Sequence, residues 1–255
     1  MNPDALIDAA RVIASASRVA VLTGAGISAE SGVPTFRDAQ TGLWANFRPE
    51  EVATPEAFAA NPRMVWDWYA SRRKQLESVV PNAGHRAIAE LERRSAHFTL
   101  ITQNVDGLHA QAGSKRVLEL HGNIRRSKCF AENVVVESWP ETGEVPPRCP
   151  FCGSWLRPDV VWFGEMLPQG AYEAALEAAQ SCEVFLSVGT STEVEPAASL
   201  PFVALERGAT VIEVNLQPTP LSRRASIILR GPAADVLPQL VRTAWPGRIR
   251  SWLHL

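Results

Sequence analysis

His121 is the side chain in this 255-residue sequence best suited to acid–base chemistry. It follows the predicted strand 117–120 and precedes a glycine. An imidazole near its ordinary pKa takes a proton from a hydroxyl at neutral pH, so His121 is a candidate general base. A lone histidine is more often structural. This one falls at the same predicted sheet edge as two further polar loops, which begin at Gly24 and Gln103.

The loop that begins at Gly24 directly follows the apolar run 19–22. Glycines at this point let backbone N–H groups approach a phosphate, because no Cβ intervenes. The dinucleotide pattern G-x-G-x-x-G/A is matched by Gly24, Gly26 and Ala29. Ser28 and Glu30 add polar groups for ribose or phosphate, while Pro34 prevents the long following helix of a dehydrogenase. We therefore expect a nucleotide loop that does not serve hydride transfer; a tight turn is the simpler alternative.

A second polar loop follows the apolar run 98–101. Its polar side chains include Gln103, Asn104 and Asp106. Side-chain amides suit a carboxamide or ribose hydroxyls. Asp106 alternatively caps a short helix through an Asx turn, although that leaves the two amides unexplained. Small or polar residues also follow two later apolar runs, at 189–191 and at Asn215, where the adenosine half of a nucleotide is expected.

Short, nearly continuous apolar runs alternate with helical patterns along the chain. Such runs are typical of parallel strands covered on both faces, so we expect an α/β protein with an open, doubly wound parallel sheet. Its ligand should lie at the carboxyl ends of the strands. The predicted strands are 18–23, 98–102, 117–120, 183–188, 210–214 and 226–229. The predicted helices are 4–16, 62–78, 83–94, 169–180, 196–207 and 232–244.

Two stretches interrupt this alternation. Residues 35–80 are rich in aromatic side chains and are predicted to form a helical insert. Residues 125–157 hold three of the four cysteines, in the pattern C-x₂-E, sixteen residues, C-x₂-C; these are Cys129, Cys149 and Cys152. Glu132 occupies the position at which a fourth cysteine would complete a zinc site. The sequence is therefore compatible with a zinc ion that has a carboxylate ligand and with a module without metal. Cys182 precedes a predicted strand and is expected to be a small core residue.

Composition bounds the classes of function. An apolar share of 46% supports a sizeable core, and the net charge of −2 gives no electrostatic reason to expect nucleic acid as a partner. No apolar run is long enough to span a bilayer, and the first residues do not resemble a secretion signal. We therefore expect a cytoplasmic protein with no membrane partner. Nothing in the sequence indicates an oligomer, and we expect a monomer.

Together these motifs resemble the sirtuin family of NAD-dependent protein lysine deacylases. The match runs from about Val19 to the C-terminal helix and comprises, in family order, GAGISAESGVPTFRD, TQNVDGLH, LHG, RPDVVWFGE, GTS and VN. The resemblance implies a Rossmann-like NAD-binding domain formed by residues 1–34, 81–124 and 158–255. It also implies a smaller domain with substrate held between the two. That domain comprises the helical insert 35–80 and the zinc-ribbon-like module 125–157.

The resemblance also implies roles for individual residues. The acyl-lysine carbonyl oxygen attacks the ribose as nicotinamide leaves, Asn104 supports that catalytic step, and His121 activates a ribose hydroxyl as general base. The products are free lysine, nicotinamide and O-acyl-ADP-ribose. The three cysteines, with Glu132 as a candidate fourth ligand, match a structural zinc site. The implied NAD contacts are Gly24, Ala25, Gly26, Ser28, Glu30, Phe36, Arg37, Gln103, Asn104, Val105, Asp106, Gly189, Thr190, Ser191, Asn215, Leu216, Gln217 and Ala233.

Tyr69 and Arg72 resemble the Tyr-x-x-Arg of the class III branch, which removes succinyl and malonyl groups. At positions i and i+3 of a helix they share one face, and a guanidinium with a phenol suits the distal carboxylate of such an acyl group. An exposed Arg72 is the simpler alternative. We expect succinyl, malonyl and acetyl groups on protein lysine as substrates. The resemblance implies further substrate contacts at Val160, Val161, Trp162, Phe163 and Gly164. This apolar segment could be a plain edge strand or a strand that pairs with the backbone of a peptide.

Other functions stay open on the sequence alone. A deacetylase or an ADP-ribosyltransferase uses the same first step, and acyl selectivity separates these from a desuccinylase. A non-catalytic NAD-binding module is disfavoured by His121 and Asn104, which stand in otherwise complete motifs. A Rossmann oxidoreductase needs a ribose-binding acid after a second strand, and no second predicted strand precedes Glu50 and Glu51.

Overall fold

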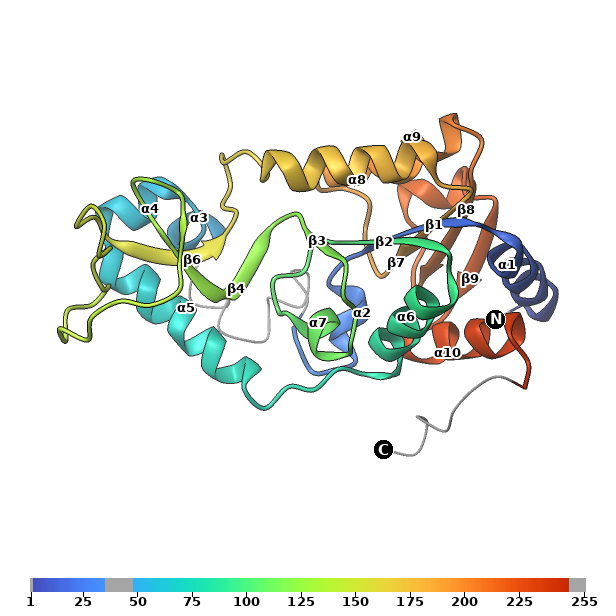
Figure 1. Cartoon of the computed structure of the whole chain (residues 1–255), viewed down its shortest axis with the longest axis horizontal. Helices are drawn as coiled ribbons and strands as arrows, with labels where there is room; N and C mark the ends of the chain where they lie inside the picture. Colours follow the sequence, from blue (N-terminus) through green and yellow to red (C-terminus); the bar gives the residue numbers. More distant parts are fainter. Residues whose placement is uncertain (1, 35–47, 248–255) are drawn as a thin grey trace.

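The computed structural model describes residues 2–34 and 48–247. Within them, six parallel strands form one sheet in the order β3-β2-β1-β7-β8-β9 (Figure 1). The predicted doubly wound α/β fold is confirmed. The strands are β1 (Arg18–Thr23), β2 (His97–Thr102), β3 (Val117–Glu119), β7 (Val184–Val188), β8 (Thr210–Asn215) and β9 (Ile227–Arg230).

The strand order places a topological switch point between β1 and β7. After β1 the chain adds β2 and β3 on one side of the sheet, and after β7 it adds β8 and β9 on the other side. Ligands of such sheets bind where the connections from the two central strands diverge. The loops that follow Thr23 and Val188 therefore flank the expected crevice.

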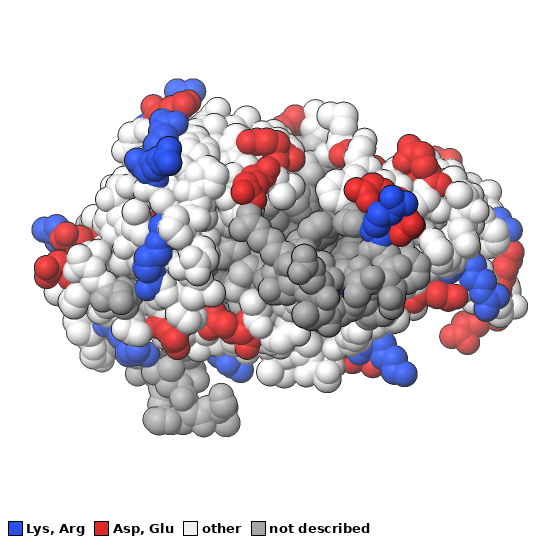
Figure 2. Space-filling view, turned by 180° about the vertical axis from the view of Figure 1, so that it is seen from behind, with Lys and Arg blue, Asp and Glu red and all other residues white. Residues whose placement is uncertain are grey.

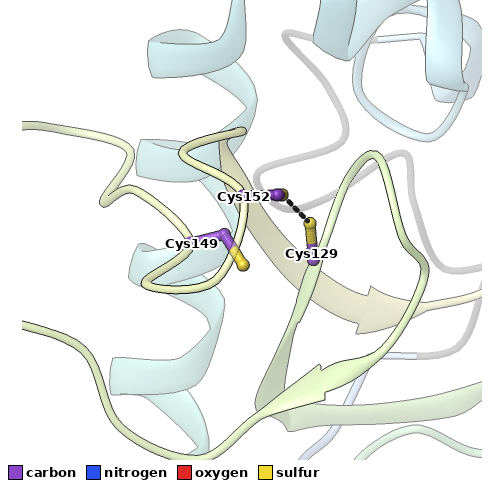
Figure 3. Close-up of side chains that lie close together, drawn as sticks. All are labelled: Cys129, Cys149 and Cys152. Atoms are coloured by element: carbon purple, nitrogen blue, oxygen red, sulfur yellow. Dashed lines mark hydrogen bonds between the residues drawn. The ribbon is translucent and has the colours of Figure 1, made fainter.

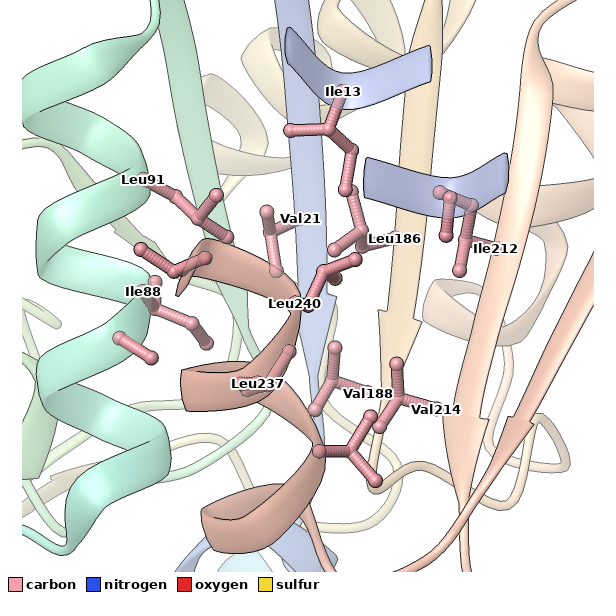
Figure 4. Close-up of a cluster of buried hydrophobic side chains, with 14 of the residues drawn as sticks. Ile13, Val21, Ile88, Leu91, Leu186, Val188, Ile212, Val214, Leu237 and Leu240 are labelled. Carbon is pink, nitrogen blue, oxygen red and sulfur yellow. The ribbon is translucent and has the colours of Figure 1, made fainter. Parts of the chain in front are cut away.

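Both faces of the sheet are buried, which explains the continuous apolar runs. Along β1, Val19 and Val21 belong to one core cluster, while Ala20 and Leu22 belong to the other. The first cluster lies against α1, α6 and α10, where Leu237 and other side chains pack on the sheet (Figure 4). The second lies against α8 and α9. These helices are α1 (Pro3–Ser15), α6 (Ala83–Arg94), α8 (Gln169–Ser181), α9 (Leu200–Glu206) and α10 (Ala233–Ala244).

A small lobe lies beside the main sheet and consists of three helices and a three-stranded antiparallel sheet (Figure 1). Its core is rich in aromatic rings, including Phe58, Trp68 and Trp162. This agrees with the predicted helical insert and ribbon-like module. The elements are α3 (Pro49–Val52), α4 (Pro55–Ala60), α5 (Pro62–Leu76), β4 (Gly122–Cys129), β5 (Val135–Val136) and β6 (Leu156–Val160), with sheet order β5-β4-β6.

The antiparallel pair β4–β6 joins the two lobes. Each strand crosses a domain boundary expected from the sequence, β4 at 124/125 and β6 at 157/158. The strand expected within 160–165 ends at Val160, and residues 161–165 continue outside regular structure. Since β4 starts directly after His121, this pair ties the candidate base to the small lobe.

Outside the helical insert, three of the short helices, α2, α7 and η4, had no predicted counterpart, because helices of four residues show no hydrophobic period. One of them, α2, has only four residues, in agreement with the expectation that no long helix follows Gly24. The predicted helix 196–207 begins as a 3₁₀ turn and continues as α9. The short elements are α2 (Gly26–Ala29), α7 (Leu108–Gln111), η3 (Ala197–Ser199) and η4 (Pro220–Arg223).

Charged side chains are dispersed on the surface. On the face shown in Figure 2, cationic and anionic groups are interspersed, without one broad basic field among the described residues. In the described part of the chain, no helix combines the length and apolar character needed to cross a membrane.

Candidate active site

The loops after β1 and β7 cross at the switch point with almost no space between their backbones. Gly26 N–H donates to Gly189 O at 2.8 Å, and Gly24 N–H donates to Val188 O at 3.1 Å. A Cβ added to Gly26 would lie 2.7 Å from Gly189 O, and one added to Gly24 would lie 2.8 Å from Thr190 Cβ. Glycine is therefore required for the crossing itself, in addition to any contact with a nucleotide.

Three backbone N–H groups at this crossing have no acceptor among the described residues. They belong to Ala25, Thr190 and Ser191. Phosphate oxygens accept hydrogen bonds from such converging groups. The loop after β7 is fixed from both sides, because Asn215 Nδ2 donates to Thr190 O at 2.9 Å and Gln103 Nε2 donates to Thr190 Oγ1 at 2.9 Å. The donors at the crossing thus fit the pyrophosphate of a dinucleotide.

A buried network connects the Gly24 loop to the loop after β2. Ser28 Oγ donates to Asp106 Oδ2 at 2.7 Å, and Asn104 Nδ2 donates to Gly24 O at 3.0 Å and to Ser28 Oγ at 3.1 Å. Burial raises the pKa of Asp106, while hydrogen bonds from Leu108 N–H and Ser28 oppose that rise. Asp106 therefore does both things that the sequence allowed: it caps α7 through Leu108, and it joins the polar network.

Two buried histidines, not selected from the sequence, extend this network. His85 Nδ1 accepts the N–H of Asn82 at 3.3 Å, so its Nε2 carries the hydrogen that points to Ser28 Oγ at 3.3 Å. His109 Nε2 lies 2.9 Å from Thr23 Oγ1. Burial lowers the pKa of His85 to about 4 and that of His109 to about 3, so both are neutral at pH 7. The sequence offers only a weak indication of the His85 contact with Asn82: His85 occupies the third position of a predicted helix, after an asparagine cap.

His121 is held in one tautomer by the backbone. Its Nδ1 lies 3.0 Å from Gln103 O, and because a carbonyl oxygen only accepts, Nδ1 carries the hydrogen. The lone pair is therefore on Nε2, which has no partner among the described residues. Burial lowers the pKa of His121, and the bond to Gln103 opposes this, so the imidazole is neutral at pH 7. The structure thus presents the predicted base in its proton-accepting form.

The backbone of His121 also contacts the small lobe. Val161 N–H donates to His121 O at 2.9 Å, and Phe163 N–H donates to Ala53 O at 2.9 Å. Residues 160–164 therefore lie between the candidate base and the helical insert. The Phe163 side chain is half exposed, whereas Trp162 is buried.

Tyr69 and Arg72 lie on α5, on the small-lobe side of the site. Tyr69 is buried, and its hydroxyl accepts the indole N–H of Trp162 at 2.8 Å. The Arg72 guanidinium carbon lies 4.8 Å from the centroid of the Trp68 ring, a cation–π geometry, and burial lowers the pKa of Arg72. The simpler alternative of a solvated surface charge at Arg72 does not describe this environment.

Other predicted cofactor residues lie around the same edge. The Glu30 carboxylate accepts the N–H of Ala234 at 3.2 Å, next to Ala233 at the start of α10, and burial raises the pKa of Glu30. Leu216 is exposed directly after β8, and Gln217 O accepts from Arg230 at 3.2 Å. Val105 lies in the loop between β2 and α7, and its carbonyl oxygen accepts a hydrogen bond from Ile124 N–H. Two further predicted contacts, Phe36 and Arg37, lie outside the described residues.

The structure gathers three thiols at one end of the small lobe. The sulfurs of Cys129, Cys149 and Cys152 all lie within 4.8 Å of one another, and Figure 3 shows them converging from β4 and the C-x-x-C turn. Glu132 contributes its backbone N–H to Cys129 Sγ at 3.4 Å, but its exposed carboxylate is not part of this group of ligand atoms. Converging thiols with an N–H donor fit a zinc site that lacks a fourth protein thiolate. Cys182 is a buried core residue, and burial raises its thiol pKa to about 11.

A profile of the Sir2 family matches residues 24–196, which is more than half of the chain. The chain belongs to the Sir2 family. The Sir2 match contains the Gly24 loop, His121 and all three clustered cysteines, whereas Asn215 and Ala233 follow its end. The matched range thus covers most of the residues that the sheet edge and the small lobe bring together.

Individual Sir2 relatives are similar over nearly their whole length. The chain is 50% identical over 244 residues to NAD-dependent protein deacylase 1 of Pseudomonas aeruginosa, covering 92% of this chain and 98% of that protein. A crystal structure of a Sir2 homologue–NAD complex has a TM-score of 0.86 and 47% identity, covering 96% and 94% of the two chains. The structure of Sir2Af2 bound to a myristoylated histone peptide has a TM-score of 0.76 and 39% identity, covering 95% and 97%.

Proposed function

We propose that this Sir2-family chain is an NAD-dependent protein-lysine deacylase that removes succinyl and malonyl groups as well as acetyl groups. The acyl group passes from the lysine nitrogen to ADP-ribose as one water is consumed, with release of nicotinamide and free lysine. The observation that carries the proposal is the state of His121. It is neutral, fixed by Gln103 O and without a partner at Nε2 in the described part of the chain, as a base that deprotonates a ribose hydroxyl requires.

Several observations support NAD as co-substrate. The donors at the Gly24–Gly189 crossing suit its pyrophosphate, and Asn215 at the end of β8 suits a ribose hydroxyl. Asn104 and Asp106 lie beside Ser28 in a buried site. Their polar groups can form hydrogen bonds with the carboxamide of nicotinamide as it departs. The likeness to a Sir2 homologue solved with NAD points the same way.

The acyl preference rests on Tyr69 and Arg72. A guanidinium can bind a carboxylate through two parallel hydrogen bonds, and a phenol beside it supplies a further hydrogen bond. Succinyl and malonyl groups end in a carboxylate that matches this pair, whereas an acetyl group is small enough to fit without using it. Peptide binding is assigned to Val160, Val161, Trp162, Phe163 and Gly164, which lie beside His121. The NAD-binding part and the small lobe then form the two walls of the substrate site.

We also propose a structural zinc ion held by Cys129, Cys149 and Cys152, with the fourth position filled by water or by the Glu132 carboxylate after a side-chain rotation. The site lies in a core cluster with Trp66 and Leu156. Zinc therefore stabilises the small lobe and takes no part in the chemistry at His121. Elemental analysis of the purified protein tests this assignment.

Product analysis separates the proposed reaction from its alternatives. A succinyl-lysine peptide incubated with NAD and the enzyme should give equal amounts of nicotinamide, deacylated peptide and O-succinyl-ADP-ribose, measured by mass spectrometry. ADP-ribose attached to protein would indicate an ADP-ribosyltransferase instead. Turnover of the acetyl peptide alone would indicate a deacetylase. Binding of NAD without any product would identify a non-catalytic module.

A further inference from the structure

The Tyr69 hydroxyl is buried. It accepts one hydrogen bond, and its own hydrogen is still to be placed. An indole N–H only donates, so in the 2.8 Å contact with Trp162 the Tyr69 oxygen is the acceptor. The Tyr69 hydrogen itself has no acceptor among the described residues. Burial raises the pKa of Tyr69 to about 12, so the hydroxyl keeps that hydrogen at neutral pH. A buried donor without an acceptor is costly and calls for a ligand atom that accepts.

Trp162 is fixed in place from several directions. The Arg157 guanidinium carbon lies 3.3 Å from the centroid of its ring, and the Trp162 backbone N–H donates to Glu165 at 2.8 Å. Arg157 and Glu165 form an ion pair, with Arg157 Nη2 to Glu165 Oε2 at 2.9 Å. Phe58 packs on the indole with ring centroids 5.4 Å apart. The indole N–H therefore has little freedom to turn away from Tyr69.

Tyr69 is equally confined. Its ring stands edge-on to Trp68 with centroids 4.6 Å apart, and it lies 6.2 Å from the Trp162 ring. Arg72 is one helical turn further along α5 and acts electrostatically on the phenol. A donor of fixed direction and a cation thus lie on the same side of the helix.

We propose that Trp162 determines acyl specificity as a positioning residue. By occupying the acceptor side of the Tyr69 oxygen, it makes Tyr69 an obligate hydrogen-bond donor toward the distal carboxylate of a dicarboxylic acyl group. This inference rests on the proposed removal of succinyl and malonyl groups, and it adds Trp162, 93 residues away from Tyr69 in the chain, to the residues that select them.

The physical reason for the selectivity is an asymmetry between acyl groups. A carboxylate accepts the Tyr69 hydrogen and pairs with Arg72, and a hydrogen bond to a charged group contributes about twice as much as a neutral one. The methyl end of an acetyl group offers no acceptor, so the orientation of the hydroxyl is irrelevant to it. Without the indole donor the Tyr69 hydroxyl is free to rotate and to accept, which weakens the bond to a carboxylate and leaves acetyl binding less affected.

The test compares Trp162→Phe, Tyr69→Phe and the double variant with the native protein, using succinyl and acetyl versions of one lysine peptide and saturating NAD. We expect Trp162→Phe to lower kcat/KM for the succinyl peptide about tenfold more than for the acetyl peptide, chiefly through KM. In the Tyr69→Phe background the same substitution should add no further selective loss. Trp139→Phe is the matched control: the Trp139 ring stands edge-on to Trp66, in a different core cluster from Tyr69, and both activities should stay unchanged.

The outcomes separate this inference from the function on which it rests. If the native protein removes succinyl groups but Trp162→Phe lowers both activities equally, or its selective loss persists in the Tyr69→Phe background, the role of Trp162 is overturned and the function stands. If the native protein turns over only the acetyl peptide, the proposed acyl class fails and the role of Trp162 fails with it. Tyr69→Phe removes one buried oxygen, so it tests the donor role even if Trp162→Phe does not fold.

Discussion

The sheet edge and the small lobe build the two sides of the site in different ways. At the sheet edge, loops that the strand order brings together are joined by short hydrogen bonds, such as Ser28 to Asp106 at 2.7 Å, and by backbones in contact at Gly26. In the small lobe, aromatic rings from distant segments pack together, as Phe58 does on Trp162, and guanidinium groups lie over rings, as Arg157 does over Trp162.

This difference separates two tasks. The sheet edge tolerates almost no change in shape, because a single Cβ at Gly26 meets a backbone oxygen, and the proposed function assigns to it the steps common to all acyl groups. The small lobe packs through side chains, which can vary without altering the sheet, so the proposed function assigns the choice of acyl group to it. Substitutions on the two sides should therefore give different patterns of loss.

The largest effect is expected for His121→Ala on the sheet-edge side. Removing a general base should lower kcat by about 10²–10⁴-fold, equally for succinyl and acetyl peptides. Steady-state nicotinamide release measures this, and thermal unfolding checks that the fold is intact. His97→Ala, at an exposed position at the start of β2, is the matched control and should retain activity. Turnover preserved in His121→Ala would remove the proposed base.

Arg72→Met should give the opposite pattern on the small-lobe side. Loss of an ion pair with the acyl carboxylate should reduce kcat/KM for the succinyl peptide about 10–100-fold, with far less effect on the acetyl peptide. Arg63→Met lies on the same helix at an exposed position and should change neither activity. Equal losses for both peptides would mean that Arg72 supports the fold of the lobe and does not read the acyl group.

Gly26→Ala should show how little space the sheet edge allows. The new methyl group would lie 2.7 Å from Gly189 O, so we expect a loss of about 1–3 kcal/mol in the free energy of unfolding and weaker binding of NAD. Denaturant titration and calorimetry measure the two quantities. Gly170→Ala in the first turn of α8, where the added Cβ meets nothing within 4 Å, should cause no such loss. A stable Gly26→Ala variant with native NAD affinity would contradict the crossing as described.

The smallest effect concerns pH. Burial lowers the pKa of His121 below its ordinary value of 6.5, and in the proposed mechanism the neutral imidazole is the active base. Activity should therefore persist as the pH falls through 6.5 and decline only below it, with the same midpoint for both peptides. The pH profile of kcat/KM reports this value for the free enzyme. A midpoint above 6.5, or one that differs between the peptides, would assign the titration to another group.

The two sides also differ in how far the sequence predicts them. The six strands and the loops at Gly24, Gln103 and Asn215 were predicted because buried parallel strands are apolar runs whose ends meet at one edge. His85 and His109 were missed, since nothing local to a histidine shows that it will be buried beside Ser28 or Thr23.

In the small lobe the sequence predicted the composition but not the contacts. Tyr69 and Arg72 share a face of α5 by helical spacing alone, so their proximity was predictable. The bond from Trp162 to Tyr69 was not, because it joins segments 93 residues apart through side chains. For the three thiols, spacing had grouped Cys129 with Cys149 and Cys152, and only the fold shows that the Glu132 carboxylate lies outside this group.

The most direct test of the central claim is a competition between succinyl and acetyl versions of one lysine peptide in the same reaction with NAD. Mass spectrometry then gives the ratio of the two kcat/KM values for the native protein and for Arg72→Met. We predict that the native protein favours the succinyl peptide and that Arg72→Met reverses the preference. A native preference for the acetyl peptide that Arg72→Met leaves unchanged would contradict the assignment of acyl choice to the small lobe.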